Sequence, residues 1–214
     1  MNLKPTEILI GGAVIAALAV GGNEMIKTQV KKNNPPLVIL DPGHSTAEPG
    51  VSGGGFAEHI EVVKMAITLK WLLEKQGLAV RLTHTGDGMV KGSDSTAEIR
   101  ARTALVRQLK PAAFVSVHFN MVNSYGLVYY PMDKRPEAMR LARLIHKYCK
   151  FPADKFWSSS QSRFGRLGIL DDQDAPSALW EVCAIDDAKD DAEWRIAMAT
   201  PVAKAIVDYL GWNA

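Results

Sequence analysis

Two histidines and a glutamate, carried by separate parts of the chain, are the residues best suited to act together in chemistry. His44 follows an Asp-Pro-Gly turn at the end of a short apolar run, and His118 ends a second apolar run. Glu58 lies between them, where a Gly- and Ser-rich stretch meets a helix-like pattern. Two imidazoles, one carboxylate and a position left open for water form the coordination set of a catalytic zinc. These residues therefore predict a Zn²⁺ site that activates water.

Each of these residues also has a plainer interpretation. An isolated histidine is more often structural or solvated than a metal ligand. That description fits His59, His84 and His146. His118 differs, because an imidazole at the end of an apolar strand is costly to bury unless it is hydrogen-bonded or bound to metal. Glu48 and Glu61 lie close enough in the sequence to compete with Glu58, and spacing alone leaves that choice open.

Glu181 is the second candidate for chemistry. It interrupts the apolar segment 178–183, where a charged side chain usually has a function or a partner. Water activated by a metal needs a carboxylate that takes its proton and passes it to the leaving group. Glu181 fits that role, and the alternative is a structural ion pair with an arginine such as Arg102.

Alternating strand and helix patterns must position these residues. Short apolar runs predict strands at 37–40, 78–83, 113–118, 127–130 and 177–184. Helical spacing predicts helices at 58–76, 96–109, 136–150 and 187–210, with a loop at 45–56 and an irregular segment at 155–167. This alternation predicts an α/β fold with a mixed, largely parallel sheet flanked by helices. The side chains proposed for chemistry then lie where strands end and loops begin.

Composition narrows the class of function. The chain has 214 residues, 47% of them hydrophobic, which is enough for one large core. Its net charge of +2 is scattered, and no stripe of basic and aromatic residues is present, so we expect no nucleic-acid binding. Cys149 and Cys183 are too far apart for a CxxC motif, although they could pair in an oxidising compartment. Nothing in the sequence sets the oligomeric state.

The N-terminal region differs from the rest in composition. Ile8 to Gly22 is uncharged and rich in Gly and Ala, and it is shorter than the ~20 residues that comfortably span a bilayer. We interpret residues 1–22 as a signal peptide or weak membrane anchor, and the polar residues 23–36 as a linker. The folded domain is then 37–214. We expect it to be exported to the periplasm or cell envelope, either released there or tethered to the inner membrane.

Taken in order, the motifs resemble the Amidase_3 family of zinc-dependent N-acetylmuramoyl-L-alanine amidases, which includes bacterial envelope enzymes and phage lysis enzymes. The family's opening Asp-Pro-Gly-His motif matches residues 41–44, and its Ser-Ile-His-Ala-Asn segment matches residues 116–120. Segment 176–181 resembles the one that ends in the family's catalytic glutamate. His84 departs from the pattern, because it stands where the family usually has an arginine. The resemblance covers about residues 37–210.

The resemblance implies hydrolysis of the amide between the lactyl group of N-acetylmuramic acid and L-alanine in peptidoglycan, in cell lysis or wall remodelling. It makes His44, Glu58 and His118 the zinc ligands and Glu181 the general base and acid. It gives Arg102 and Asn120 supporting roles towards substrate or structure. Two alternatives remain: a zinc peptidase acting on stem or cross-link peptides, and a catalytically inactive wall-binding module.

Overall fold

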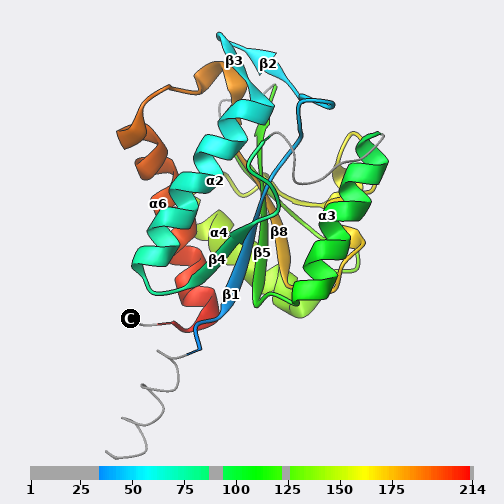
Figure 1. The fold of residues 1–214 in the computed structure, drawn as a ribbon, viewed down its shortest axis with the longest axis vertical. Helices are drawn as coiled ribbons and strands as arrows, with labels where there is room; N and C mark the ends of the chain where they lie inside the picture. The colour runs from blue at the N-terminus through cyan, green and yellow to red at the C-terminus, as the bar shows by residue number, and fades with distance from the viewer. Residues whose placement is uncertain (1–33, 87–93, 122–125, 213–214) are drawn as a thin grey trace, which may run out of the picture. The chain divides into compact units, whose positions relative to one another are not determined.

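The computed structural model describes residues 34–86, 94–121 and 126–212, and a compact unit begins at Pro36. Its centre is a six-stranded sheet in the order β4-β1-β5-β8-β6-β7. Figure 1 labels four of these strands, β4, β1, β5 and β8. The strands are β1 (Leu37–Pro42), β4 (Ala79–Leu82), β5 (Ala113–Asn120), β6 (Leu127–Tyr130), β7 (Phe156–Ser158) and β8 (Ser177–Ala184). β4, β1, β5 and β8 run parallel, whereas β6 is antiparallel to β8 and β7 is parallel to β6. The prediction of a mixed, largely parallel sheet is confirmed.

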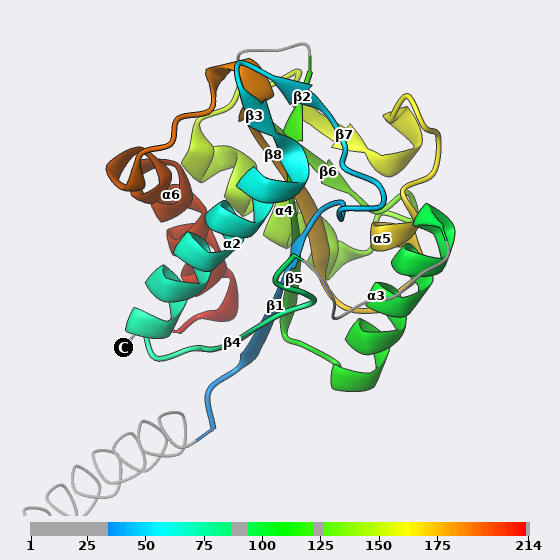
Figure 2. The same cartoon turned by 45° about the horizontal axis from the view of Figure 1, so that its top comes forward.

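Helices cover both faces of the sheet, as Figures 1 and 2 show. α2 (Glu58–Lys75), α4 (Pro136–Cys149) and α6 (Ala192–Leu210) pack on one face. α3 (Ser95–Leu109) and the short α5 (Gly168–Asp171) cover the other. The two faces therefore have separate apolar cores.

The central strands are mostly apolar because both of their faces are buried. In β1, Val38 and Leu40 pack into the core under α2, whereas Ile39 between them packs into the core under α3. β8 follows the same rule, with Trp180 on the first side and Leu179 on the second. Since strand side chains alternate between faces, a strand with helices on both sides is expected to carry apolar residues at consecutive positions.

Several predicted boundaries were wrong in ways that matter for the site. β1 extends to Pro42 and β5 to Asn120, so His118 lies within its strand rather than at its end. The predicted loop 45–56 contains a small hairpin of β2 (Ser52–Gly53) and β3 (Phe56–Ala57). The predicted irregular segment 155–167 contains β7 and a 3₁₀ turn, because pairing with β6 supplies backbone hydrogen bonds that a strand of three residues does not signal by itself.

The prediction of a leader or anchor falls on residues 1–22, and that of a linker mostly on the residues after it, outside the described part of the chain. In the ranges that are described, no helix is both long and apolar enough to cross a membrane. Cys149 and Cys183 are unpaired thiols that belong to the same core, Cys183 buried and Cys149 partly so.

Candidate metal centre and catalytic cleft

Three elements bring His44, Glu58 and His118 together at the carboxyl end of the parallel strands. His44 lies two residues after the end of β1, His118 lies near the end of β5, and Glu58 is the first residue of α2. The neighbouring strand β8 places Glu181 opposite His118 in the strand register. All four residues line one cleft of about 880 Å³. Residues that are distant in sequence thus meet where loops leave a parallel sheet, the usual place for functional sites in α/β folds.

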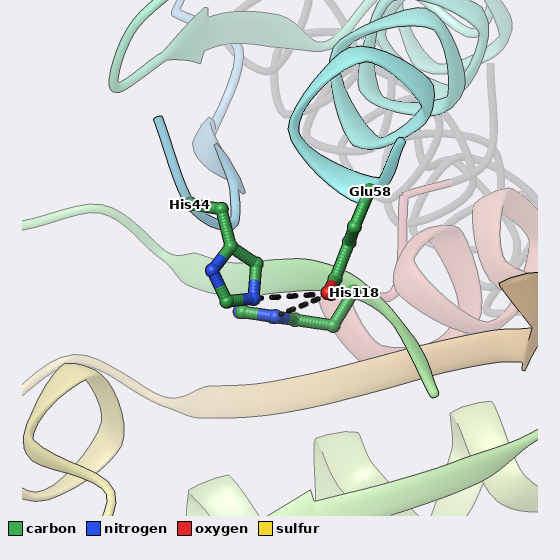
Figure 3. A group of neighbouring side chains, drawn as sticks. All are labelled: His44, Glu58 and His118. Carbon is green, nitrogen blue, oxygen red and sulfur yellow. Dashed lines mark hydrogen bonds and ion pairs between the residues drawn. The ribbon is translucent and has the colours of Figure 1, made fainter. Parts of the chain in front are cut away.

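The three side chains point towards one another, as Figure 3 shows. One potential ligand atom from each lies within 4.8 Å of the others. Oε1 of Glu58 is 3.2 Å from Nε2 of His44 and 3.1 Å from Nδ1 of His118. The backbone N–H groups of Val51 and Phe119 each donate to the Glu58 carboxylate at 2.9 Å. These two bonds hold the carboxylate in place, and neither competing glutamate joins the group.

The turn before His44 depends on glycine. A side chain at Gly43 would place its Cβ 2.2–2.6 Å from three atoms of the His118 ring, so only glycine lets the two elements approach this closely. His44 itself has φ 64°, a left-handed conformation that few non-glycine residues adopt. Its Nδ1 donates to the carbonyl of Glu48 at 3.2 Å, which turns Nε2 towards Glu58. A backbone bond on the far nitrogen is how ligand histidines are commonly oriented.

The charges at this group favour the protonation states that metal ligands need. Burial raises the pKa of Glu58, but hydrogen bonds and charge from His118 and His44 hold it well below its usual range. Burial lowers the pKa of His118 below its ordinary value, and this outweighs the opposing effect of Glu58. The group therefore offers an ionised carboxylate and a neutral imidazole, the forms in which these side chains bind metal.

A buried ion pair supports the end of β1 behind the site. Asp41 has no exposed surface, and its carboxylate accepts from Thr83 Oγ1 at 2.6 Å and from Ser116 Oγ at 2.7 Å. Nη1 of Arg102, from α3, lies 3.2 Å from Oδ2 of Asp41 and 3.4 Å from the carbonyl of Pro42. Arg102 therefore pairs with Asp41, and the alternative of an Arg102–Glu181 ion pair is wrong.

Glu181 has an unusual environment for a carboxylate. It is partly buried, and its Oε2 atom is buried without a hydrogen-bond partner among the described residues. Burial, and secondarily the charge of Glu58, raise its pKa to about 8, while Arg163 opposes the shift. A carboxylate with a raised pKa in a cleft can exchange protons near neutral pH.

The other residues singled out in the sequence fall outside the group or at its edge. Asn120 lines the cleft. His84 is buried, and its Nε2 donates to the backbone carbonyl of Pro42 at 2.7 Å. His146 donates through Nε2 to the backbone carbonyl of Pro152 at 2.9 Å. Sequence reasoning missed Arg163, which lines the cleft from a segment predicted only to be irregular. Its position depends on the pairing of β7 with β6, which no local pattern announces.

The fold and this cleft define an α/β domain with a His/Glu/His group at the carboxyl edge of its sheet. Residues 38–209 match the family model Amidase_3, described as N-acetylmuramoyl-L-alanine amidase. Because the match covers most of the chain, the chain belongs to this family, as its motifs predicted.

Curated relatives and solved structures agree with that assignment. A "Probable cell wall amidase LytH" of Staphylococcus epidermidis is 27% identical over 81% of this chain and 56% of its own length. The chain thus spans about half the length of the curated relatives it matches. The catalytic domain of the amidase CwlV from Bacillus (Paenibacillus) polymyxa has TM-score 0.68 at 23% identity, covering 83% of this chain and 99% of that one. Cwp6 from Clostridium difficile has TM-score 0.70 at 24% identity, and the match covers 83% of this chain and 30% of Cwp6. These structures share the fold.

Proposed function

We propose that the chain is a zinc-dependent N-acetylmuramoyl-L-alanine amidase, which hydrolyses the amide between the muramic lactyl group and L-alanine in peptidoglycan. The observation that carries the proposal is the placement of Glu181, with its raised pKa, in the same cleft as the His/Glu/His group. Family membership supplies the reaction, and the cleft supplies residues suited to it.

The residues present fit a zinc ion. His44, Glu58 and His118 would hold it, since they offer two imidazole nitrogens and one carboxylate, with no thiolate to make a closed structural site. When bound, zinc supplies Lewis acidity that polarises the amide carbonyl and acidifies water. Gly43, Val51 and Phe119 keep the ligands in position before any ion arrives, because they fix the spacing and orientation of the three side chains.

Glu181 would move the proton. In its ionised form it accepts a proton from the attacking water, and it then returns that proton to the departing alanine nitrogen. Burial raises the pKa of Glu181 to about 8, which makes it a stronger base for the first of these steps. A cation held by the His/Glu/His group would oppose that shift, so Glu181 would be ionised before the attack and would give up its proton more readily in the second step. The two effects together suit one carboxylate for both roles.

The test is product analysis with the full chain and purified peptidoglycan. An amidase releases stem peptides with a free N-terminal L-alanine and leaves muramic acid without peptide, both identifiable by mass spectrometry. Cleavage between two amino acids would instead support a peptidase and overturn the proposal. Release of nothing, with binding to the wall retained, would support an inactive binding module.

Matched variants separate the roles. His118→Ala should lose zinc and turnover together, whereas His146→Ala, on α4, should keep both. Glu181→Gln should lose most turnover, about 10²-fold or more, and keep its zinc. Full zinc occupancy in the His118→Ala protein would contradict the ligand assignment.

Action at the cell envelope belongs to the same proposal. The relatives named cell wall amidases support it, as does the apolar composition of Ile8 to Gly22. Fractionation of cells that express the full chain, with the N-terminus of the mature protein sequenced, distinguishes a cleaved signal peptide from a retained anchor. Recovery of all the protein with an intact N-terminus in the cytosolic fraction would refute export.

A further inference from the structure

Arg163 is a cation in the cleft that forms no ion pair with a carboxylate of the described residues. It is exposed, and it lines the same cleft as Glu181. Its guanidinium carbon lies 4.6 Å from the centre of the Phe164 ring, and it forms no ion pair with any residue in the described ranges. Stacking on an aromatic ring steadies a guanidinium without occupying its N–H donors. Those donors remain available to a ligand in the cleft.

The other arginines that line the cleft are already engaged. Arg166 forms an ion pair with Asp172, and Arg102 forms one with the buried Asp41. Arg163 therefore differs from them in forming no ion pair within the described part of the chain.

The charge of Arg163 acts on the residue proposed to move the proton. Burial and Glu58 raise the pKa of Glu181, whereas Arg163 lowers it, and Arg163 also opposes the raised pKa of Tyr129. Charges act this way only over short distances in a protein. An anion bound by Arg163 would thus lie close to Glu181, in the cleft that both residues line.

The chemistry of the substrate says which anion this is. In peptidoglycan the carboxyl of the lactyl group is consumed in the scissile amide, so free carboxylates near that bond belong to the peptide. Where the second residue of the stem peptide is linked to the third through its side-chain carboxyl, its α-carboxylate stays free. In amidated cell walls this α-carboxylate is replaced by an uncharged carboxamide. We propose that Arg163 binds this peptide carboxylate and so makes the enzyme prefer non-amidated stem peptides. The inference rests on the proposed amidase function.

The experiment compares two defined muropeptides that differ only in carrying a carboxylate or a carboxamide at the second stem residue. The wild-type chain should cleave the carboxylate form with a kcat/KM about tenfold higher, as expected for one charge-assisted bond pair. Arg163→Met should abolish that preference, mainly by raising KM for the carboxylate substrate. Arg163→Lys should retain part of it. Arg166→Met is the matched control and should keep the full preference, since its guanidinium is already paired.

Equal loss on both substrates in Arg163→Met would overturn the inference, because it would mean that Arg163 acts only on the protonation of Glu181. Absence of any preference in the wild-type chain would overturn it too, while leaving the amidase function intact. Binding of the two free stem peptides, measured by calorimetry, provides a readout without turnover. Tighter binding of the carboxylate peptide, abolished by Arg163→Met, supports the inference even if no bond is cleaved and the proposed function fails.

Discussion

Arg102→Met tests how the buried ion pair behind the site holds the fold together. The substitution keeps much of the side-chain volume but removes the charge that faces Asp41, which is fully buried. Removing one partner of a buried pair costs about 3–5 kcal/mol, since the remaining charge is left uncompensated. Thr83 and Ser116 still donate to Asp41, so the lower end, about 3 kcal/mol, applies. For a domain of this size, that corresponds to a fall in Tm of roughly 6–12 °C.

The pH dependence of this loss is the sharper test. Burial raises the pKa of Asp41, but Arg102, Thr83 and Ser116 together hold it below its usual value. A carboxyl with a lowered folded pKa contributes stability that is present above its unfolded pKa, about 3.9, and is lost as pH falls through the folded value. Without Arg102 the effect of burial prevails and the pKa rises, so acid neutralises Asp41 and removes the cost of the substitution. The difference in stability should be largest near pH 7 and narrow towards pH 4.

Thermal and urea unfolding at pH 7, 5.5 and 4, followed by circular dichroism, measures both quantities. Arg140→Met is the control, because Arg140 pairs with Glu137 at the surface and exposed pairs contribute little. A difference between wild type and Arg102→Met that stays constant from pH 7 to pH 4 would refute the electrostatic reasoning. If Arg102→Met lowers the Tm no more than the control does, the buried ion pair does not stabilise the fold as argued.

Three further predictions concern the site and the thiols. Gly43→Ala should reduce zinc content and turnover at least tenfold, since its Cβ would lie within 2.6 Å of the His118 ring; normal zinc content would contradict this. Chelation should abolish turnover and lower the Tm, and added Zn²⁺ should restore both; an unchanged Tm would argue against a bound ion. Cys149 and Cys183, whose pKa values burial raises to about 12, should react slowly with iodoacetamide at pH 8 until guanidinium unfolds the chain; rapid labelling of the native protein, read by intact mass, would count against it.

Much of the fold was predictable because its strands and helices carry strong local patterns. The central strands are mostly apolar runs, and α2 shows clear helical spacing from Glu58 onwards. The order of the strands and the reversal of β6 were not predictable in the same way, since both depend on pairing between distant segments. β7 was missed for the same reason: it is only three residues long, and its neighbour β6 provides the ladder.

For the site, the sequence indicated which residues could do chemistry, and the structure showed which side chains they contact. The convergence of His44, Glu58 and His118 agrees with the motif order, and their role as zinc ligands stays a prediction. Which carboxylate Arg102 would meet could not be derived from spacing, because Asp41 and Glu181 are both candidates until β1, β5 and α3 are placed together. The free charge of Arg163 was equally invisible, since it depends on what its neighbours already bind.

The register between β5 and β8 has a consequence for how activity is lost on heating. His118 and Glu181 lie opposite each other on the two central strands, so separating them breaks the β5–β8 ladder and costs much of the free energy of global unfolding. His44 instead belongs to a turn whose following residues are largely exposed, and such segments open at much lower free-energy cost. If the three side chains hold Zn²⁺ as proposed, warming should first release it by opening the His44 side, with His118 and Glu181 still paired across their strands. Inactivation of that kind is reversible, and cooling with Zn²⁺ present should recover the enzyme without refolding it.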